Sequence, residues 1–209
     1  MLSLQRLLGR PALFFGLLEQ SAVLGAESVS ALRALLVQRA TAPDLETFSS
    51  LRRRDKAVIN QLEEALTQIF ITPIEREDLE SVATELYRLP KTVEKFAERY
   101  EIVWDKVADY DFSLAAHMLE SAARIIVEMV HSLSGGCDLG AIKAMDARLS
   151  QIEADAGRVL LDTLRKLYEP GGDPLREIIA HDLCQILGDC LEVCRAIGRT
   201  IALVIHKNS

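Results

Sequence analysis

The side chains of this sequence that could do chemistry are acids, bases, histidines and cysteines spaced along helical patterns. Asp55 is the most unusual, because it interrupts an apolar stripe. On a helical wheel it lies in line with Phe48, Leu51, Val58, Leu62 and Ile69. A buried carboxylate needs a partner, and Arg52, Arg54 and Lys56 are near it in sequence. Two interpretations stay open: a locally exposed interruption or intrahelical ion pair, and a buried acid in contact with basic side chains.

Cysteines and histidines at helical spacing resemble metal ligands but have simpler explanations. Cys190 and Cys194 are four residues apart and fall on an apolar stripe. We expect them to be small core residues, because free cysteine packs as a hydrophobe. His181 and Cys184 fall on the opposite, polar face of the same helix, so the four residues do not converge.

Alternating charges on the fourth predicted helix indicate a solvated face rather than a set of ligands. This polar stripe consists of His117, Glu120, Arg124, Glu128 and His131. Nothing in the chain matches a phosphate-cradling glycine loop, a Ser-His-Asp order or a dinucleotide fingerprint. The sequence therefore predicts that the protein is not an enzyme and has no catalytic residues.

Composition favours an all-helical protein that does not bind nucleic acid. The 209 residues are 49% hydrophobic and only 5% aromatic, with few prolines, which is typical of helical proteins. A net charge of -7 excludes a binder that works by neutralising nucleic-acid phosphates over its whole surface. The length suits one domain, or two small helical halves that share a core.

The distribution of charges and cysteines indicates the compartment. The longest uncharged run, residues 65–74, is much shorter than the roughly 18 apolar residues that suggest a membrane span. The four cysteines form no Cys-x-x-Cys pair, and a helical protein of this size does not need disulfides. We expect a cytoplasmic protein without a transmembrane segment, soluble or peripheral to the inner face of the membrane.

Glycines and prolines divide the chain into six long helical segments, which predict an elongated six-helix bundle. The segments are 11–39, 44–69, 73–104, 112–134, 139–168 and 174–206. Residues 55–100 and 153–197 form a weak internal repeat, in which a helix ends in an aromatic residue before a proline-marked turn. We expect a single domain, 1–209, of two related three-helix halves, 11–104 and 112–206.

The turn between the second and third segments reads Phe-Ile-Thr-Pro-Ile-Glu-Arg-Glu-Asp at residues 70–78. Thr72 is expected to be the N-cap of the third helix, Pro73 its first residue, and Glu75 the second half of a capping box. The nonamer closely resembles the Phe-Ile-Thr-Pro-Ile-Asp-Arg-Glu-Asp signature of PhoU-like phosphate transport regulators, in the branch that accompanies Pit-type inorganic phosphate transporters. The signature residues at this hinge are Thr72, Pro73, Glu75, Arg76, Glu77 and Asp78. The resemblance implies two similar three-helix units.

The resemblance also implies transition-metal sites, which Glu/Asp-x-x-x-Asp motifs on four helices form in this family. Two of these motifs are lost, because they fall on Arg52 with Lys56 and on Tyr87 with Lys91. The other two fall on Gln151 with Asp155 and on Gly188 with Glu192, so each retains one acid. Two carboxylates and an amide bind a cation such as iron, zinc or nickel only loosely. Asp155 and Glu192 are thus a weak, residual metal site.

Basic residues occupy most of the positions of the lost metal-binding motifs. Arg52, Arg53, Arg88 and Lys91 would form a basic patch able to hold an anion such as phosphate, or an acidic partner. The resemblance implies an accessory or regulatory role in inorganic phosphate transport, with a Pit-type transporter or a signalling protein as partner and possible homodimerisation. The alternative is a metal-binding bundle that keeps a reduced site around Gln151, Glu153, Asp155, Asp189 and Glu192.

Overall fold

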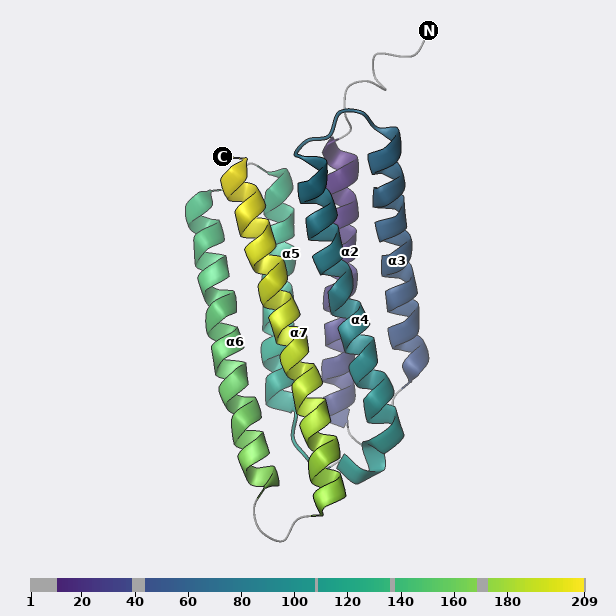
Figure 1. The fold of residues 1–209 in the computed structure, drawn as a ribbon, viewed down its shortest axis with the longest axis vertical. Coiled ribbons are helices and arrows are strands. Elements are labelled where there is room, and N and C mark those ends of the chain that lie inside the picture. The colour runs from purple at the N-terminus through teal and green to yellow at the C-terminus, as the bar shows by residue number, and fades with distance from the viewer. Residues whose placement is uncertain (1–10, 39–43, 108, 136–137, 169–172, 209) are drawn as a thin grey trace.

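Long helices parallel to one axis make up the described part of the chain (Figure 1). The computed structural model describes residues 11–38, 44–107, 109–135, 138–168 and 173–208. Its six helices are α2 (Pro11–Gln38), α3 (Leu45–Gln68), α4 (Arg76–Val107), α5 (Ser113–Ser134), α6 (Leu139–Leu167) and α7 (Pro174–Lys207). No strand occurs among these residues, which confirms the prediction of an elongated all-α bundle.

Four helices form the centre of the bundle, and α3 and α6 lie outside them on opposite sides (Figure 1). Helices α2, α3 and α4 all contact one another, and so do α5, α6 and α7. Contacts of α2 with α5 and of α4 with α7 join these two groups. The core therefore lies where α2, α4, α5 and α7 meet, while the repeat relationship between the two halves stays a prediction.

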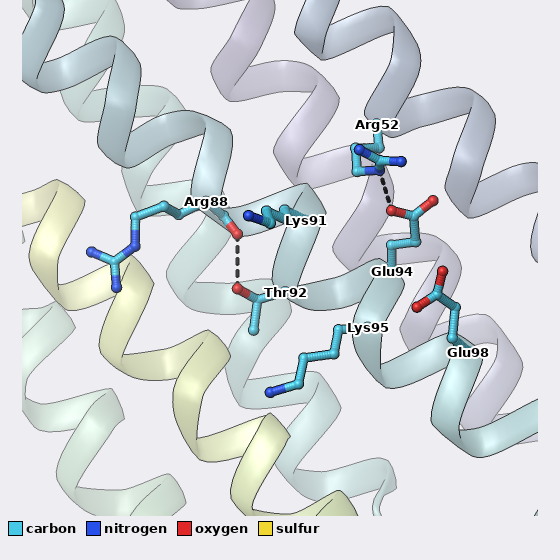
Figure 2. Close-up of a pocket in the computed structure, with 7 residues that line it drawn as sticks. All are labelled: Arg52, Arg88, Lys91, Thr92, Glu94, Lys95 and Glu98. Atoms are coloured by element: carbon cyan, nitrogen blue, oxygen red, sulfur yellow. Dashed lines mark hydrogen bonds and ion pairs between the residues drawn. The ribbon is translucent and has the colours of Figure 1, made fainter.

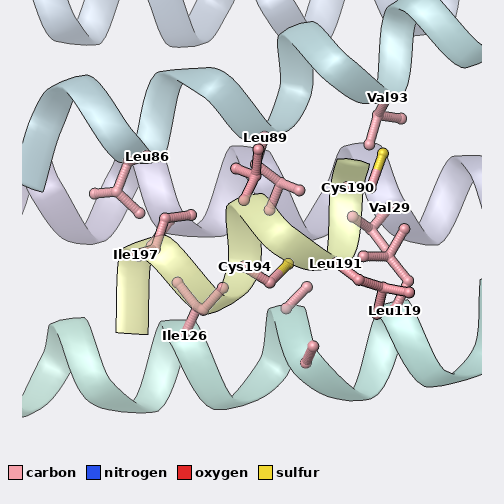
Figure 3. Packing of buried hydrophobic residues seen from close by; sticks show 14 of the residues in the cluster. Val29, Leu86, Leu89, Val93, Leu119, Ile126, Cys190, Leu191, Cys194 and Ile197 are labelled. Atoms are coloured by element: carbon pink, nitrogen blue, oxygen red, sulfur yellow. The ribbon is translucent and has the colours of Figure 1, made fainter. Parts of the chain in front are cut away.

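Aliphatic side chains from the four central helices fill this core (Figure 3). Cys190 and Cys194 of α7 are buried among them, as predicted. Desolvation raises the pKa of the Cys194 thiol to about 12, so it stays protonated and packs as an apolar group. The expectation for Cys184 was wrong: it is also buried, because α7 contacts α4, α5 and α6 and leaves little of its surface free.

Helix α2 is the described helix that is long and apolar enough to cross a membrane by length and composition. More than half of its most apolar window is buried within the bundle, where α2 contacts α3, α4 and α5. A core helix of a soluble protein passes the same test, so this composition is explained by burial.

Aspartates start three of the helices. Asp44, Asp138 and Asp173 each accept a hydrogen bond from the backbone N–H two residues further on. Such N-caps satisfy backbone donors that have no partner within the helix. The predicted start of the last helix at Asp173 and Pro174 is thus confirmed.

The predicted capping box at Thr72 is wrong, because α4 begins at Arg76. The Thr72 hydroxyl donates a hydrogen bond to the carbonyl oxygen of Ile74 over 2.7 Å, instead of accepting one from a helix N–H. Pro73 therefore lies in a bend before the helix. The Glu75 carbonyl accepts hydrogen bonds from the N–H groups of Asp78 and Leu79, which closes the first turn of α4.

Polar contacts at both ends connect α4 to α7. At one end, Lys207 pairs with Glu75 and with Asp78, the latter at 3.3 Å. At the other end, Arg176 donates to the carbonyl oxygen of Lys106 over 2.8 Å and pairs with Asp109. The Arg176 hydrogen bond holds the pKa of Asp109 below its ordinary value. These contacts fix how the two groups of helices meet.

Candidate functional site

A hollow of about 480 Å³ lies on the outer face of α4, close to α3 (Figure 2). It is lined by Arg52, Arg88, Lys91, Thr92, Glu94, Lys95 and Glu98. Three of the four residues of the predicted basic patch thus lie together. Arg53 does not join them, because it is exposed and pairs with Glu46 on its own helix.

Arg52 is held inside the bundle surface by two partners from α4. It forms an ion pair with Glu94, which is nearly buried, and its Nη1 lies 3.5 Å from the Tyr87 hydroxyl. The contact with Tyr87 and the negative charge of Glu94 raise the pKa of the Arg52 guanidinium, although desolvation opposes them. Arg52 therefore connects α3 to α4 and contributes little free charge to the hollow.

The accessible cations of the hollow are on α4. Arg88 pairs with Glu85 at 2.6 Å, and both lie on the same helix. Lys95 reaches Asp189 of α7 only at 3.9 Å, and Lys91 has no ion pair with any described residue. Exposed pairs of this kind contribute little stability, so these side chains can exchange their partners for a ligand at small cost.

Lys95 and Glu94 line this site but were not predicted from the sequence. Lys95 follows Lys91 by four residues, a spacing that places both on one helix face. That signal was available in the sequence. The position of Glu94 opposite Arg52 could not be predicted from the sequence, since it depends on how α3 packs against α4.

Asp55 contradicts the expectation of an exposed interruption or an intrahelical ion pair. Its exposed fraction is 0%, and neither carboxylate oxygen has a hydrogen-bond partner of good geometry among the described residues. Arg52 and Arg54 instead pair with Glu94 of α4 and Glu27 of α2, because they leave α3 in other directions. Burial raises the pKa of Asp55 to about 6, and the nearby Ser21 hydroxyl opposes that rise.

The residual carboxylates on α6 and α7 do not fit a metal cluster. Asp155 accepts a hydrogen bond from Gln151 over 2.9 Å and pairs with Arg158, so its charge is already compensated. Glu192 is exposed on α7. In the part of the chain that the structure describes, no three His, Cys, Asp or Glu side chains converge closely enough to hold an ion.

An arginine bridges two helices in the second half as well. Arg195 of α7 pairs with Asp146 of α6, and its Nε lies 3.7 Å from Glu153. The guanidinium is mostly buried, and its Nη1 and Nη2 donate to the two carboxylate oxygens of Asp146, which is a bidentate geometry. Glu153, which belongs to the alternative metal set, is thus engaged with a cation.

The polar stripe of α5 also serves helix packing. Glu120 lies between Arg124 of its own helix, at 3.3 Å, and Arg33 of α2, at 3.1 Å. His131 Nδ1 lies 3.0 Å from a carboxylate oxygen of Glu19. The stripe therefore connects α2 to α5 instead of converging on a ligand.

The fold is that of PhoU-like proteins. Two crystal structures of PhoU-like proteins from Shewanella oneidensis MR-1 superpose on the chain with a TM-score of 0.71 and 14% identity. One, described as a PhoU-like phosphate regulatory protein, aligns with 93% of this chain and 99% of its own. The other aligns with 92% and 96%, respectively. The chain is thus an all-α protein of PhoU-like architecture.

The chain also has a relative at the level of sequence. The chain is 22% identical over 144 residues to the UPF0111 protein YkaA of Bacillus subtilis strain 168, which covers 69% of this chain and 70% of that protein. No family model matches the chain.

Proposed function

We propose that this protein is a non-enzymatic accessory or regulatory protein of inorganic phosphate transport that acts by binding another protein. The observation that carries the proposal is the fold, which a PhoU-like phosphate regulatory protein shares over 93% of this chain. The turn at residues 70–78 adds support, because it resembles the signature of the branch that accompanies Pit-type phosphate transporters.

The proposed partner is a Pit-type transporter or a signalling protein that controls phosphate uptake. The protein would then act in the cytoplasm, at the inner face of the membrane. The exposed cations of α4 support a binding role, because their contacts with other described residues are few and weak. They form a surface that a partner can contact without unfolding the bundle.

Binding to the transporter can be tested with tagged protein and membranes from cells of the source organism. We expect the tagged protein to co-purify with a Pit-type transporter after mild detergent treatment. Membranes from cells that lack the transporter gene should retain less of the tagged protein. Equal retention on both membranes, with no regulator of phosphate uptake in the eluate, would contradict the proposal.

A further inference from the structure

Basic residues lie in a row along the outer face of α4, and exposed apolar side chains lie at the end of that row. Arg88, Lys91, Lys95 and Arg99 are spaced by three, four and four residues, and Ile102 comes three residues later. Residues at these spacings lie on one face of a helix. We call the four basic residues the cation row.

An apolar hollow of about 310 Å³ lies at the end of the cation row, between α4 and α7. It is lined by Arg99, Ile102, Val103, Ile178, Ile179, Asp182 and Leu183. Ile102 is 72% exposed and Ile178 is 65% exposed. Two large, exposed aliphatic side chains that line the same hollow are typical of an interaction surface. Isolated exposed apolar side chains, in contrast, are common on protein surfaces.

The row is too long for one small anion. Arg88 and Lys95 are seven residues apart, which is about 10 Å along a helix at roughly 1.5 Å per residue. Figure 2 shows the ends of Arg88, Lys91 and Lys95 pointing to separate places and not to a common centre. A single phosphate would need several donors within hydrogen-bond distance of the same few oxygens.

We propose that the cation row and the apolar hollow together dock an acidic amphipathic helix of a partner protein. Carboxylates on one face of such a helix would pair with Arg88, Lys91 and Lys95. Large apolar side chains on the same face, further along, would enter the hollow beside Ile102 and Ile178. This is the helix-in-groove mode of recognition, with anchors three, four and seven residues apart.

Acidic residues flank the row on both sides and limit where a docked carboxylate can lie. Glu94 and Glu98 lie on the side of the hollow toward α3, whereas Arg88 and Lys95 lie toward α7 (Figure 2). Glu94 is paired with Arg52, so the acids left to repel a carboxylate are Glu98, and Asp182 and Asp189 of α7. A docked carboxylate must therefore avoid Glu98 on the α3 side and displace Asp182 or Asp189 on the α7 side.

The pairs that the row makes now do not prevent docking. Arg99 lies 3.4 Å from Asp182 and Lys95 lies 3.9 Å from Asp189, and all four side chains are about half exposed. Exposed pairs exchange at small energetic cost, and partial burial by a docked helix would strengthen the new ones.

Binding of synthetic peptides to the full chain tests this inference, which rests on the proposed function only for the existence of a partner. The probe is a fluorescent helical peptide with glutamates at the spacing of the row and leucines further along the same face. Its control is a twin with lysines in place of the glutamates. Fluorescence anisotropy at low and physiological salt should show binding of the acidic peptide alone, weakened by salt.

Matched variants locate the binding surface. Lys91→Glu with Lys95→Glu should weaken binding by about tenfold, since it replaces two attractions with repulsions. Lys143→Glu with Lys166→Glu, two exposed lysines of α6, should leave binding unchanged. Ile102→Asp with Ile178→Asp should also weaken binding, whereas Leu203→Asp, at a residue 70% exposed, should not.

Several outcomes would overturn the inference. They are no binding of the acidic peptide, equal binding of the lysine twin, or equal losses in the α4 and α6 variants. Displacement of the peptide by inorganic phosphate, but not by chloride at equal ionic strength, would assign the row to a small anion instead. The peptide-binding assay contains no transporter. A negative result would therefore overturn the docking inference without contradicting the proposed role in phosphate transport, which has a separate test.

Discussion

Arg76 at the start of α4 donates a hydrogen bond from Nη2 to the carbonyl oxygen of Ile69, 2.6 Å away at the end of α3. Its Nη1 donates to the carbonyl oxygen of Leu66 in the last turn of α3. These carbonyls are among those that have no partner within the helix. Arg76 therefore caps one helix while it begins the next, and the turn is held by its side chain and not by Thr72.

Replacing Arg76 should destabilise the bundle. We expect Arg76→Met to lower the free energy of unfolding by about 2 kcal/mol, because it removes charged hydrogen bonds to carbonyls that stay partly buried. Urea denaturation followed by circular dichroism measures this change. The control is Arg165→Met, at an exposed arginine that pairs with Asp162 of its own helix, and its effect should stay within about 0.5 kcal/mol. Equal effects of the two variants would refute the capping role.

Asp55 should make the protein less stable as the pH rises. Its pKa is near 3.8 in the unfolded chain and about 6 in the folded chain. At a pH below both pKa values the carboxyl is protonated in the folded and in the unfolded chain, so it does not lower the free energy of unfolding. Between them the folded chain holds the proton more tightly, so stability falls as the pH rises from about 4 to about 6. Above pH 6 the loss is complete, at about 3 kcal/mol.

The variant Asp55→Asn isolates this effect, because it keeps the shape and removes the charge. The difference in unfolding free energy between the variant and the unchanged protein should grow from pH 4 to pH 6.5 in favour of the variant. Asp105→Asn, at an exposed residue of α4, serves as the control and should show no such trend. A difference for Asp55→Asn that does not change with pH would mean that Asp55 has an ordinary pKa.

The ion pair of Arg52 with Glu94 should behave as a partly buried pair. Arg52→Met leaves the nearly buried Glu94 carboxylate without its cation and should cost about 3 kcal/mol of stability. The double variant Arg52→Met with Glu94→Leu removes both charges and should recover most of that loss. If the double variant is as unstable as the sum of the single ones, the two residues are not energetically coupled.

The sequence predicts the helices well because their apolar stripes are long and regular. Leu79, Val82, Leu86 and Val93 of α4 are all buried, as their spacing requires. The start of α4 was misplaced by three residues, because Thr72 and Pro73 have the local chemistry of a helix start. The carbonyls that Arg76 contacts belong to another helix, and no local pattern reports such a contact.

The site was less predictable than the fold, since it depends on directions in which side chains leave their helices. Arg52 and Arg53 are neighbours in sequence, yet Arg52 reaches Glu94 on α4 and Arg53 stays on α3. The same limit applies to Asp55, whose basic neighbours pair with residues of α2 and α4 instead. Only the packing of three helices determines these partners.

Metal content tests the alternative of a reduced carboxylate site. We expect elemental analysis of protein purified without chelators to find iron, zinc and nickel well below one ion per chain. The physical reason is that Asp155 is compensated by Arg158 and that, among the described residues, it belongs to no group of three or more His, Cys, Asp or Glu side chains that could hold an ion. Stoichiometric metal that is lost in Asp155→Ala would establish the alternative instead.

We propose above that this protein regulates phosphate transport by binding. Uptake of radiolabelled phosphate in cells that lack the gene is the direct test of this function. The deletion strain is complemented with the unchanged gene or with the Lys91→Glu, Lys95→Glu variant, expressed at equal protein level. We expect altered uptake in the deletion, restoration by the unchanged gene, and failure of the variant to restore it. Uptake in the deletion strain that equals that of the parent at every phosphate concentration would contradict the claim.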